Sequence, residues 1–236
     1  MAAVFGNLVA VFPVVLLLDW LWFQATGAHW VTTEKAGKII ESLSPFTGTL
    51  IYAAFTGGLL WLSSMIAAWA DNSFALHRLR PALAGNHRLH ILLGAVRAGR
   101  FASWLDHNIA GLAGNVSLGL ILGLLPKFAE FLGPPVEVRH VTLSTGQFAA
   151  AWAALGPQGL TGGAVVRTIA GLLGIGLINL GVSFGLSLTV AIRARAVPGP
   201  ERRTLYRALI RRLVRRPWTF VVPVGEPAWA PDSPHK

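Results

Sequence analysis

Few residues of this sequence are of types that carry out chemistry, and the histidines come first. Four of them lie in a polar, basic stretch, residues 71–108, and two, His87 and His90, are spaced to share one face of a helix. A zinc site needs three or four converging ligands with an outer shell. Only this pair is spaced suitably and the chain has no cysteine, so we expect a solvated face there, no metal and no cofactor.

Four polar residues interrupt long apolar runs: Asp19, Asn115, Ser117 and Asn179. An ionisable group inside a membrane span is costly and often functional, but Asp19 is close to the end of its run. We therefore favour an Asp19 side chain that extends to the membrane interface. The other three either hydrogen-bond between helices or line a polar cavity, and we favour packing.

The elements that hold these residues are predicted from composition. Charged residues make up 13% of the chain and apolar residues 53%, too few charges to cover the surface of a soluble domain. Uncharged runs of about 17–25 residues are typical of transmembrane helices. The sequence therefore predicts an all-α, polytopic helical membrane protein. Its membrane-embedded domain covers residues 1–197, with about four spans at residues 4–23, 49–69, 109–131 and 165–192.

Topology follows from the arginines. Residues 71–108 hold five arginines against two aspartates, whereas residues 24–46 hold balanced charges. Short loops rich in Lys and Arg stay in the cytoplasm, so we expect a multi-pass protein of the bacterial inner membrane with both ends cytoplasmic. Within the cytoplasmic loop, Asn86 is a plausible N-cap for a basic amphipathic helix from His87 towards Leu105, which would lie on the membrane surface or pack under the helix bundle.

One further apolar segment and two glycine pairs also carry predictions. Phe148–Leu155 is too short for a span, so we expect a short interfacial or re-entrant helix. Whether residues 140–156 span, re-enter or lie on the membrane stays open. Two G-x-x-x-G pairs, which allow close helix approach, predict that the third and fourth spans pack together. Their glycines are Gly119, Gly123, Gly181 and Gly185.

The tail, residues 198–236, combines an apolar stripe at Leu205, Leu209 and Leu213 with many arginines. We expect a basic amphipathic cytoplasmic helix that Pro217 ends, followed by a disordered Pro-rich segment. Anionic lipid headgroups are the expected partner; DNA phosphates would attract the same charges but are not favoured. The arginines are Arg202, Arg203, Arg207, Arg211, Arg212, Arg215 and Arg216.

Several runs carry a family resemblance: Gly6-Asn7-Leu8, Leu60-Trp61-Leu62-Ser63-Ser64, Gly114-Asn115-Val116-Ser117-Leu118-Gly119, and residues 138–146, from Val138-Arg139-His140 to Gly146. Together they resemble the C-terminal, membrane-embedded portion of the bacterial Gcr-type "site-specific recombinase" family over roughly residues 4–197. The resemblance supplies no catalytic residue. Since similar proteins carry a long additional N-terminal region, that region is a further expected partner.

The name of this family implies DNA strand exchange, which the residues can test. His77 and Arg80 fit the H-x-x-R of tyrosine recombinases, but no arginine precedes Arg78 and the only downstream tyrosine is Tyr206. Groups that stabilise phosphoryl transfer must converge on one phosphate, and we find no catalytic constellation in this chain. Three hypotheses stay open: a membrane protein of unknown molecular activity, a recombination-associated membrane protein, and a transport or channel component.

Overall fold

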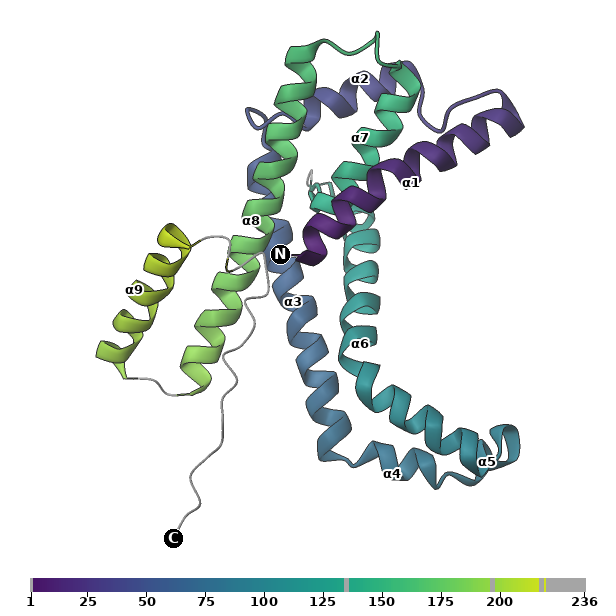
Figure 1. The fold of residues 1–236 in the computed structure, drawn as a ribbon, viewed down its shortest axis with the longest axis vertical. Coiled ribbons are helices and arrows are strands. Elements are labelled where there is room, and N and C mark those ends of the chain that lie inside the picture. The colour runs from purple at the N-terminus through teal and green to yellow at the C-terminus, as the bar shows by residue number, and fades with distance from the viewer. Residues whose placement is uncertain (1, 134–135, 196–197, 217–218, 220–236) are drawn as a thin grey trace.

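The computed structural model describes residues 2–133, 136–195, 198–216 and 219. All regular secondary structure in these residues is helical (Figure 1), which confirms the all-α prediction. The described helices are α1 (Ala2–Thr26), α2 (Thr33–Ser42), α3 (Thr49–Leu76), α4 (Leu79–Ala84), α5 (His87–Leu93), α6 (Ala95–Leu132), α7 (Val141–Leu155), α8 (Gly162–Ala194) and α9 (Gly199–Arg215).

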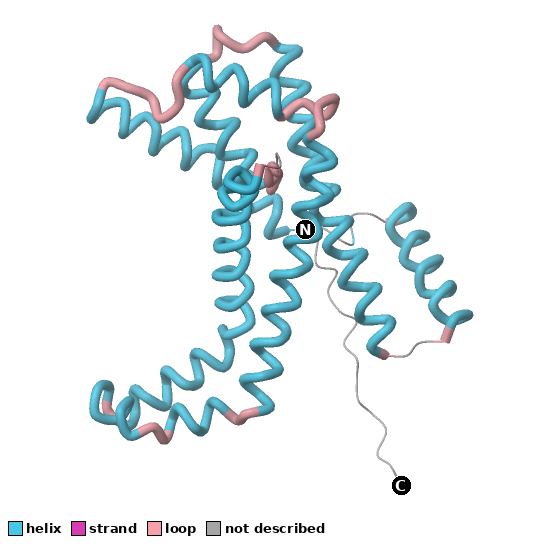
Figure 2. The backbone as a smooth tube through the Cα atoms, turned by 180° about the vertical axis from the view of Figure 1, so that it is seen from behind, coloured by secondary structure: helices cyan, strands magenta, loops and turns pink. Residues whose placement is uncertain are grey.

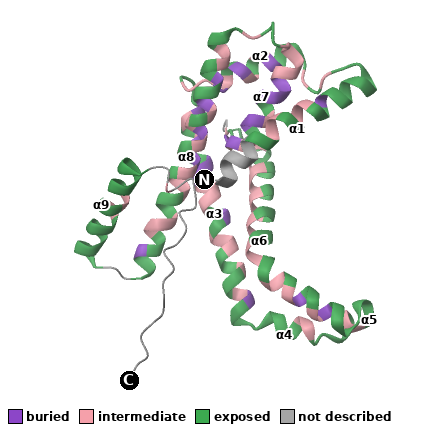
Figure 3. Cartoon of the chain, in the orientation of Figure 1, coloured by how far each residue is buried: buried purple, intermediate pink, exposed green. Residues whose placement is uncertain are grey.

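Four of these helices, α1, α3, α6 and α8, are long and apolar enough to cross a membrane. They contain the four predicted runs, so the expectation of about four membrane-crossing helices is confirmed on length and composition. Few of their residues are buried within the protein, as the predominance of exposed and intermediate residues along them shows (Figure 3). Apolar side chains that face outward over such a length require an apolar surrounding, which lipid provides.

The helix α3 is central to the packing. It packs against α8 on one side and against α6 on the other, while α1 and α2 both pack on α7 (Figure 1). A core cluster forms where these two groups meet, and it includes Leu43, Ala53, Val141, Phe148 and Ile175. The core therefore lies at one end of the described structure. The parts of α3, α6 and α8 towards the other end, where α4 and α5 lie (Figure 1), carry few buried apolar residues.

Two glycines allow α8 to approach closely both α3 and the segment that precedes α3. A Cβ atom at Gly57 would lie 2.7 Å from Cβ of Val182, and a Cβ atom at Gly171 would overlap the carbonyl oxygen of Leu43. Cβ atoms essentially never approach other atoms so closely, because the repulsion is steep. Glycine at these two positions is therefore what lets α8 lie directly against its neighbours.

The two G-x-x-x-G pairs do not make this contact. At Gly119, Gly123, Gly181 and Gly185 an added Cβ would meet no atom within 4 Å. The structure thus does not bring the two pairs together, because α8 and α6 contact α3 on its different sides.

The basic stretch of residues 71–108 departs from the predicted single helix. Asn86 does cap a helix, since its side chain accepts hydrogen bonds from the N–H groups of Arg88 and Leu89 at 2.9 and 3.2 Å. However, the chain turns at Gly94, where φ is +79°, a value that side-chain-bearing residues rarely adopt. The helix predicted from His87 to Leu105 is therefore wrong as one element: its first half is α5 and its second half begins α6.

The connection that leads into α7, residues 136–140, has an unusual position. Most loops lie at the two ends of the molecule, but residues 136–140 lie near the middle of the structure, where α7 begins (Figure 2). The helix starts at Val141, well before the apolar stretch Phe148–Leu155 from which a short helix was predicted. Its first turn consequently faces the interior, beside α3 and α8. The expectation that α7 is an interfacial or re-entrant helix stays a prediction, and spanning is the third alternative.

The predicted helix of the tail is present as α9. Arginines follow its length, and its acidic residue in the first turn is Glu201. The predicted stop at Pro217 and the predicted disorder beyond it lie outside the described residues.

Candidate functional site

Asn179 is the centre of a buried polar cluster. Its side chain, on α8, is 3% exposed and makes three hydrogen bonds to backbone groups of other segments. Its Oδ1 accepts from the N–H of Val141 at 3.1 Å, and its Nδ2 donates to the carbonyl oxygens of Ala53 at 2.8 Å and Arg139 at 3.0 Å. One amide therefore joins α8, α3 and the connection into α7.

Thr56 on α3 completes this cluster. Its hydroxyl donates to the carbonyl oxygen of Tyr52 at 2.8 Å and accepts from the N–H of Arg139 at 2.9 Å. The Arg139 side chain in turn pairs with the carboxylate of Glu137. Non-helical backbone inside an apolar bundle needs partners for its polar groups, and Thr56 and Asn179 supply them. The favoured packing role of Asn179 therefore has a detailed geometry.

A cavity of about 390 Å³ lies beside this cluster, between α3, α6, α8 and the first turn of α7. Its polar lining includes hydroxyl, amide and imidazole groups. Among these lining residues, Asn179 is hydrogen-bonded as described above. The side chains of Asn115, Thr142 and Ser183 make no hydrogen bond with the described residues. The polar lining residues are Ser63, Ser64, Asn115, His140, Thr142, Asn179 and Ser183.

His140 is the one titratable group that lines this cavity, and it precedes α7. Burial lowers its pKa below the ordinary value of histidine, because removing water disfavours the charged imidazolium. At neutral pH its ring is therefore uncharged and offers one donor and one acceptor. The cavity accordingly presents neutral polar groups without a fixed charge.

The two remaining polar residues predicted within spans lie outside this arrangement. Ser117 donates to the carbonyl oxygen of Gly114 in its own helix at 3.0 Å, so its hydroxyl is occupied locally. Asp19, on α1, does not extend outward as we favoured, because its side chain is only 1% exposed. Its carboxylate instead pairs with Nδ1 of His29 at 2.6 Å and accepts from the N–H of Trp30 at 3.0 Å.

Asp19 thereby ties the segment after α1 back onto that helix. The ring of Phe23 stacks on the ring of His29 with centroids 4.6 Å apart, which holds the imidazole against the carboxylate. A buried carboxylate is tolerated when it is paired and hydrogen-bonded. Asp19 therefore has a structural role: it holds His29 and Trp30, in the segment after α1, against the end of α1.

The arginines of the tail helix are exposed along its length. Three apolar residues of its other face, Leu209, Ile210 and Leu213, line a groove of about 440 Å³ against α8. Leu205 of the predicted stripe does not line this groove. The amphipathic character of the helix is thus expressed in the structure, with the cations outward and much of the apolar stripe towards α8.

The residues considered for metal binding or catalysis are separated. His90 hydrogen-bonds through Nε2 to the carbonyl oxygen of Ala84 at 2.5 Å, and the described residues contain no group of three or more potential His, Asp or Glu ligands. His77 and Arg80 flank the start of α4, whereas Tyr206 is on α9, which lies across α3 and α8 from it (Figure 1). These side chains do not converge.

Sequence reasoning missed one charged residue. Arg167 lies within the predicted span 165–192, in the early turns of α8, and it lines a different cavity, between α8 and α2. An arginine three residues into an apolar run was a usable signal, since ionisable residues in spans are rare. His140 and Ser183 had no such signal, because their shared cavity joins segments distant in sequence.

Comparison with known proteins gives one match. A family model described as "Site-specific recombinase" matches residues 1–223 of the chain. Neither the curated proteins nor the solved structures provide a match.

Proposed function

Since the chain belongs to the site-specific recombinase family, we propose that it is a multi-pass protein of the bacterial inner membrane with both ends in the cytoplasm. Residues 1–197 would form its membrane-embedded domain and residues 198–236 its basic tail. We propose that it acts there as a membrane-embedded component whose basic segments bind the anionic cytoplasmic leaflet.

The observation that carries this proposal is the placement of the arginines. Residues 71–108 hold Arg78, Arg80, Arg88, Arg97 and Arg100, and their turns lie at one end of the structure, whereas the balanced segment 27–48 lies at the other (Figure 2). Cytoplasmic loops of inner-membrane proteins carry the excess of Lys and Arg. This asymmetry supports a cytoplasmic location for the arginine-rich end.

The tail supports contact with lipid. Each Lys or Arg near an anionic membrane surface contributes about 1 kcal/mol of attraction, and the seven arginines of the tail from Arg202 to Arg216 are exposed. Its apolar residues outside the groove against α8, Leu205 and Val214, are exposed and favour an interfacial location over a helix that only contacts nucleic acid. A recombination-associated role, which the family description suggests, would instead place these arginines on DNA phosphates.

Single-cysteine labelling tests the topology directly, because the natural chain has no cysteine. A membrane-impermeant maleimide should label Lys35→Cys and Gln158→Cys from outside the cytoplasmic membrane. It should label Gly85→Cys and Pro198→Cys only after the membrane is permeabilised. All four positions are exposed, so burial cannot imitate protection. Labelling of Gly85→Cys in intact cells would overturn the proposed orientation.

A second candidate, a transport or channel component, is favoured by the polar cavity beside Asn179. Polar side chains without protein partners in a membrane bundle commonly mark a solute or ion pathway. Asn115, Thr142 and Ser183 are such side chains within the described residues. This candidate requires that the cavity be reached by water, which is a measurable property.

A further inference from the structure

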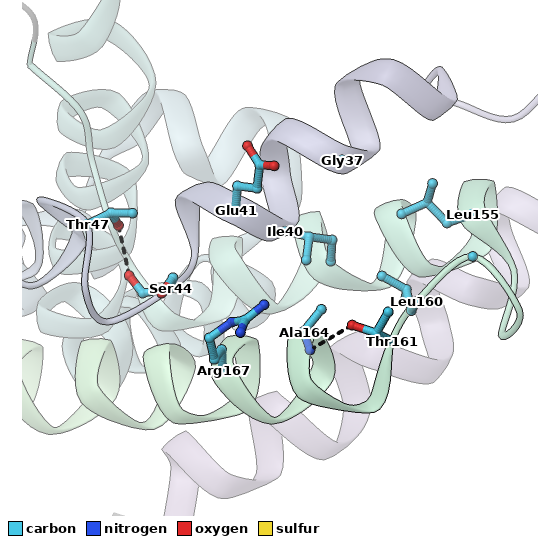
Figure 4. A pocket seen from close by; sticks show the side chains of 11 residues that line it. Gly37, Ile40, Glu41, Ser44, Thr47, Leu155, Leu160, Thr161, Ala164 and Arg167 are labelled. Carbon is cyan, nitrogen blue, oxygen red and sulfur yellow. Dashed lines mark hydrogen bonds between the residues drawn. The ribbon is translucent and has the colours of Figure 1, made fainter.

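A second cavity, of about 450 Å³, lies between α2, the connection from α7 to α8, and the first turns of α8 (Figure 4). Its size is within the range of about 300–1,000 Å³ that is usual for small-molecule sites. It is separate from the cavity beside Asn179, since the two share no lining residue.

Arg167 is the cation of this cavity. Its guanidinium extends from α8 into the space below α2 (Figure 4), and it forms no hydrogen bond or ion pair with the described residues. Lys38, another cation at this end of the molecule, is already paired with Glu34 at 2.6 Å. The planar guanidinium of Arg167 thus keeps its donors available for a ligand.

The remaining walls are of two kinds. Hydroxyl groups form one part of the lining. The Ser44 hydroxyl accepts from the N–H of Phe46 at 3.4 Å, and the Thr161 hydroxyl accepts from the N–H of Ala164 at 3.3 Å. Both O–H groups are therefore free to donate to a ligand. Apolar side chains form a second part of the lining. They are Ile40, Leu155, Leu160 and Ala164.

We propose that this cavity binds a small organic carboxylate with an apolar body. A single guanidinium matches a carboxylate through two parallel hydrogen bonds, and the apolar walls suit an alkyl or aryl group. Glu41 also lines the cavity but makes no ion pair with Arg167, and its carboxylate is directed away from the guanidinium (Figure 4). Its negative charge repels a dianion such as phosphate more strongly than a monocarboxylate, because the repulsion grows with the charge of the ligand.

The test is binding of defined probes to the purified full-length chain in detergent, measured by calorimetry. Benzoate and hexanoate should bind with a Kd of about 1 mM or tighter, and acetate should bind more weakly because it leaves the apolar walls uncovered. Benzyl alcohol, which has the same ring without the charge, and inorganic phosphate should not bind. The inference is independent of the topology proposed above, since binding to purified protein does not depend on orientation.

Arg167→Gln should weaken benzoate binding about tenfold or more, because hydrogen bonds to charged groups are the strong ones. The matched control is Arg193→Gln, which removes the same charge from the other end of α8 and should leave binding unchanged. If Arg167→Gln does not fold, Ala164→Leu takes its place. This variant keeps the charge and fills the apolar side, so it should weaken benzoate binding more than acetate binding.

Three results would overturn the proposal. They are the absence of benzoate binding to the folded wild-type chain, equal loss of binding in Arg167→Gln and Arg193→Gln, and phosphate binding as tight as that of benzoate. The last result would replace the carboxylate with a phosphate-bearing ligand. Benzoate binding that Ala164→Leu leaves unaltered would remove the apolar subsite from the proposal.

Discussion

The helix α3 packs mainly against α8 and α6, and these two contacts differ in kind. Towards α8, Gly57 allows backbone contact and Thr56 hydrogen-bonds to the connection before α7. Towards α6, Ser63 and Ser64 border a cavity that Asn115 faces from the other side. The contact with α8 at Gly57 is tight and the polar groups near it are satisfied, whereas the space where α6 approaches α3 and α8 is open and holds the amide of Asn115, which is unpaired within the described residues.

The two asparagines show why these faces differ. Asn179 lies next to backbone groups that no helix satisfies: the N–H of Val141, in the first turn of α7, and the carbonyl of Arg139, before that helix. Asn115 faces helices whose backbone groups are already paired within themselves, so its amide finds no partner among the described residues. An asparagine in an apolar helix is therefore structural where non-helical backbone comes within reach, and is otherwise available for a ligand or water.

The largest effect should come from Asn179→Leu. Loss of the amide leaves the buried N–H of Val141 and the buried carbonyl of Arg139 without partners. Each unsatisfied buried group costs about 1–3 kcal/mol, so the free energy of unfolding in detergent should fall by about 3 kcal/mol or more. Chemical or thermal unfolding of the purified chain measures this change.

Asn115→Leu is the matched control for that substitution. It makes the same chemical change in the other asparagine, which has no hydrogen bond to lose among the described residues. We expect a change in the free energy of unfolding within about 0.5 kcal/mol. Equal destabilisation by the two substitutions would abolish the distinction between the faces of α3.

An intermediate effect is expected at the tight face from Gly57→Ala. The new Cβ would lie 2.7 Å from Cβ of Val182, so α8 must shift, and overpacking of this kind costs about 1–3 kcal/mol. Gly58→Ala is the control, because a Cβ at the next position meets no atom within 4 Å. It should stabilise α3 by about 0.5–1 kcal/mol through its better helix propensity. Comparable unfolding curves for both variants would show that α3 and α8 are not in direct backbone contact.

The helices themselves were largely predictable from the sequence. Apolar runs without charge, such as residues 49–69, identify long helices because hydropathy alone demands them. Boundaries were less predictable. The break at Gly94 depends on one left-handed residue, and hydropathy carries no information on backbone angles. The tail helix followed from its leucine spacing and its arginines.

The candidate site was only partly predictable. Asn115 and Asn179 stood out as polar residues in apolar runs, but the partners of Asn179 are 38, 40 and 126 residues away in sequence. His29, the partner of Asp19, is ten residues away across a turn. Such pairings depend on tertiary packing, and no periodicity encodes them. G-x-x-x-G spacing likewise indicates that a close approach is allowed, without naming the partner.

The smallest structural perturbation tests the open face most directly. Asn115→Cys removes one amide and places a thiol on the cavity, while Val116→Cys places a thiol on the adjacent, 60% exposed position. Val116 does not line the cavity, and on an apolar helix such a side chain faces lipid. If the cavity is filled with water, as a transport or channel component requires, a charged methanethiosulfonate reagent should modify Asn115→Cys much faster than Val116→Cys, because only the thiolate reacts and lipid suppresses its formation. Adding the charged reagent to one side of the intact membrane, and in a separate experiment to the other side, shows from which side water enters the cavity. Equal, slow modification of both cysteines would mean that the cavity is dry, and the α6 face of α3 would then differ from the α8 face only in packing.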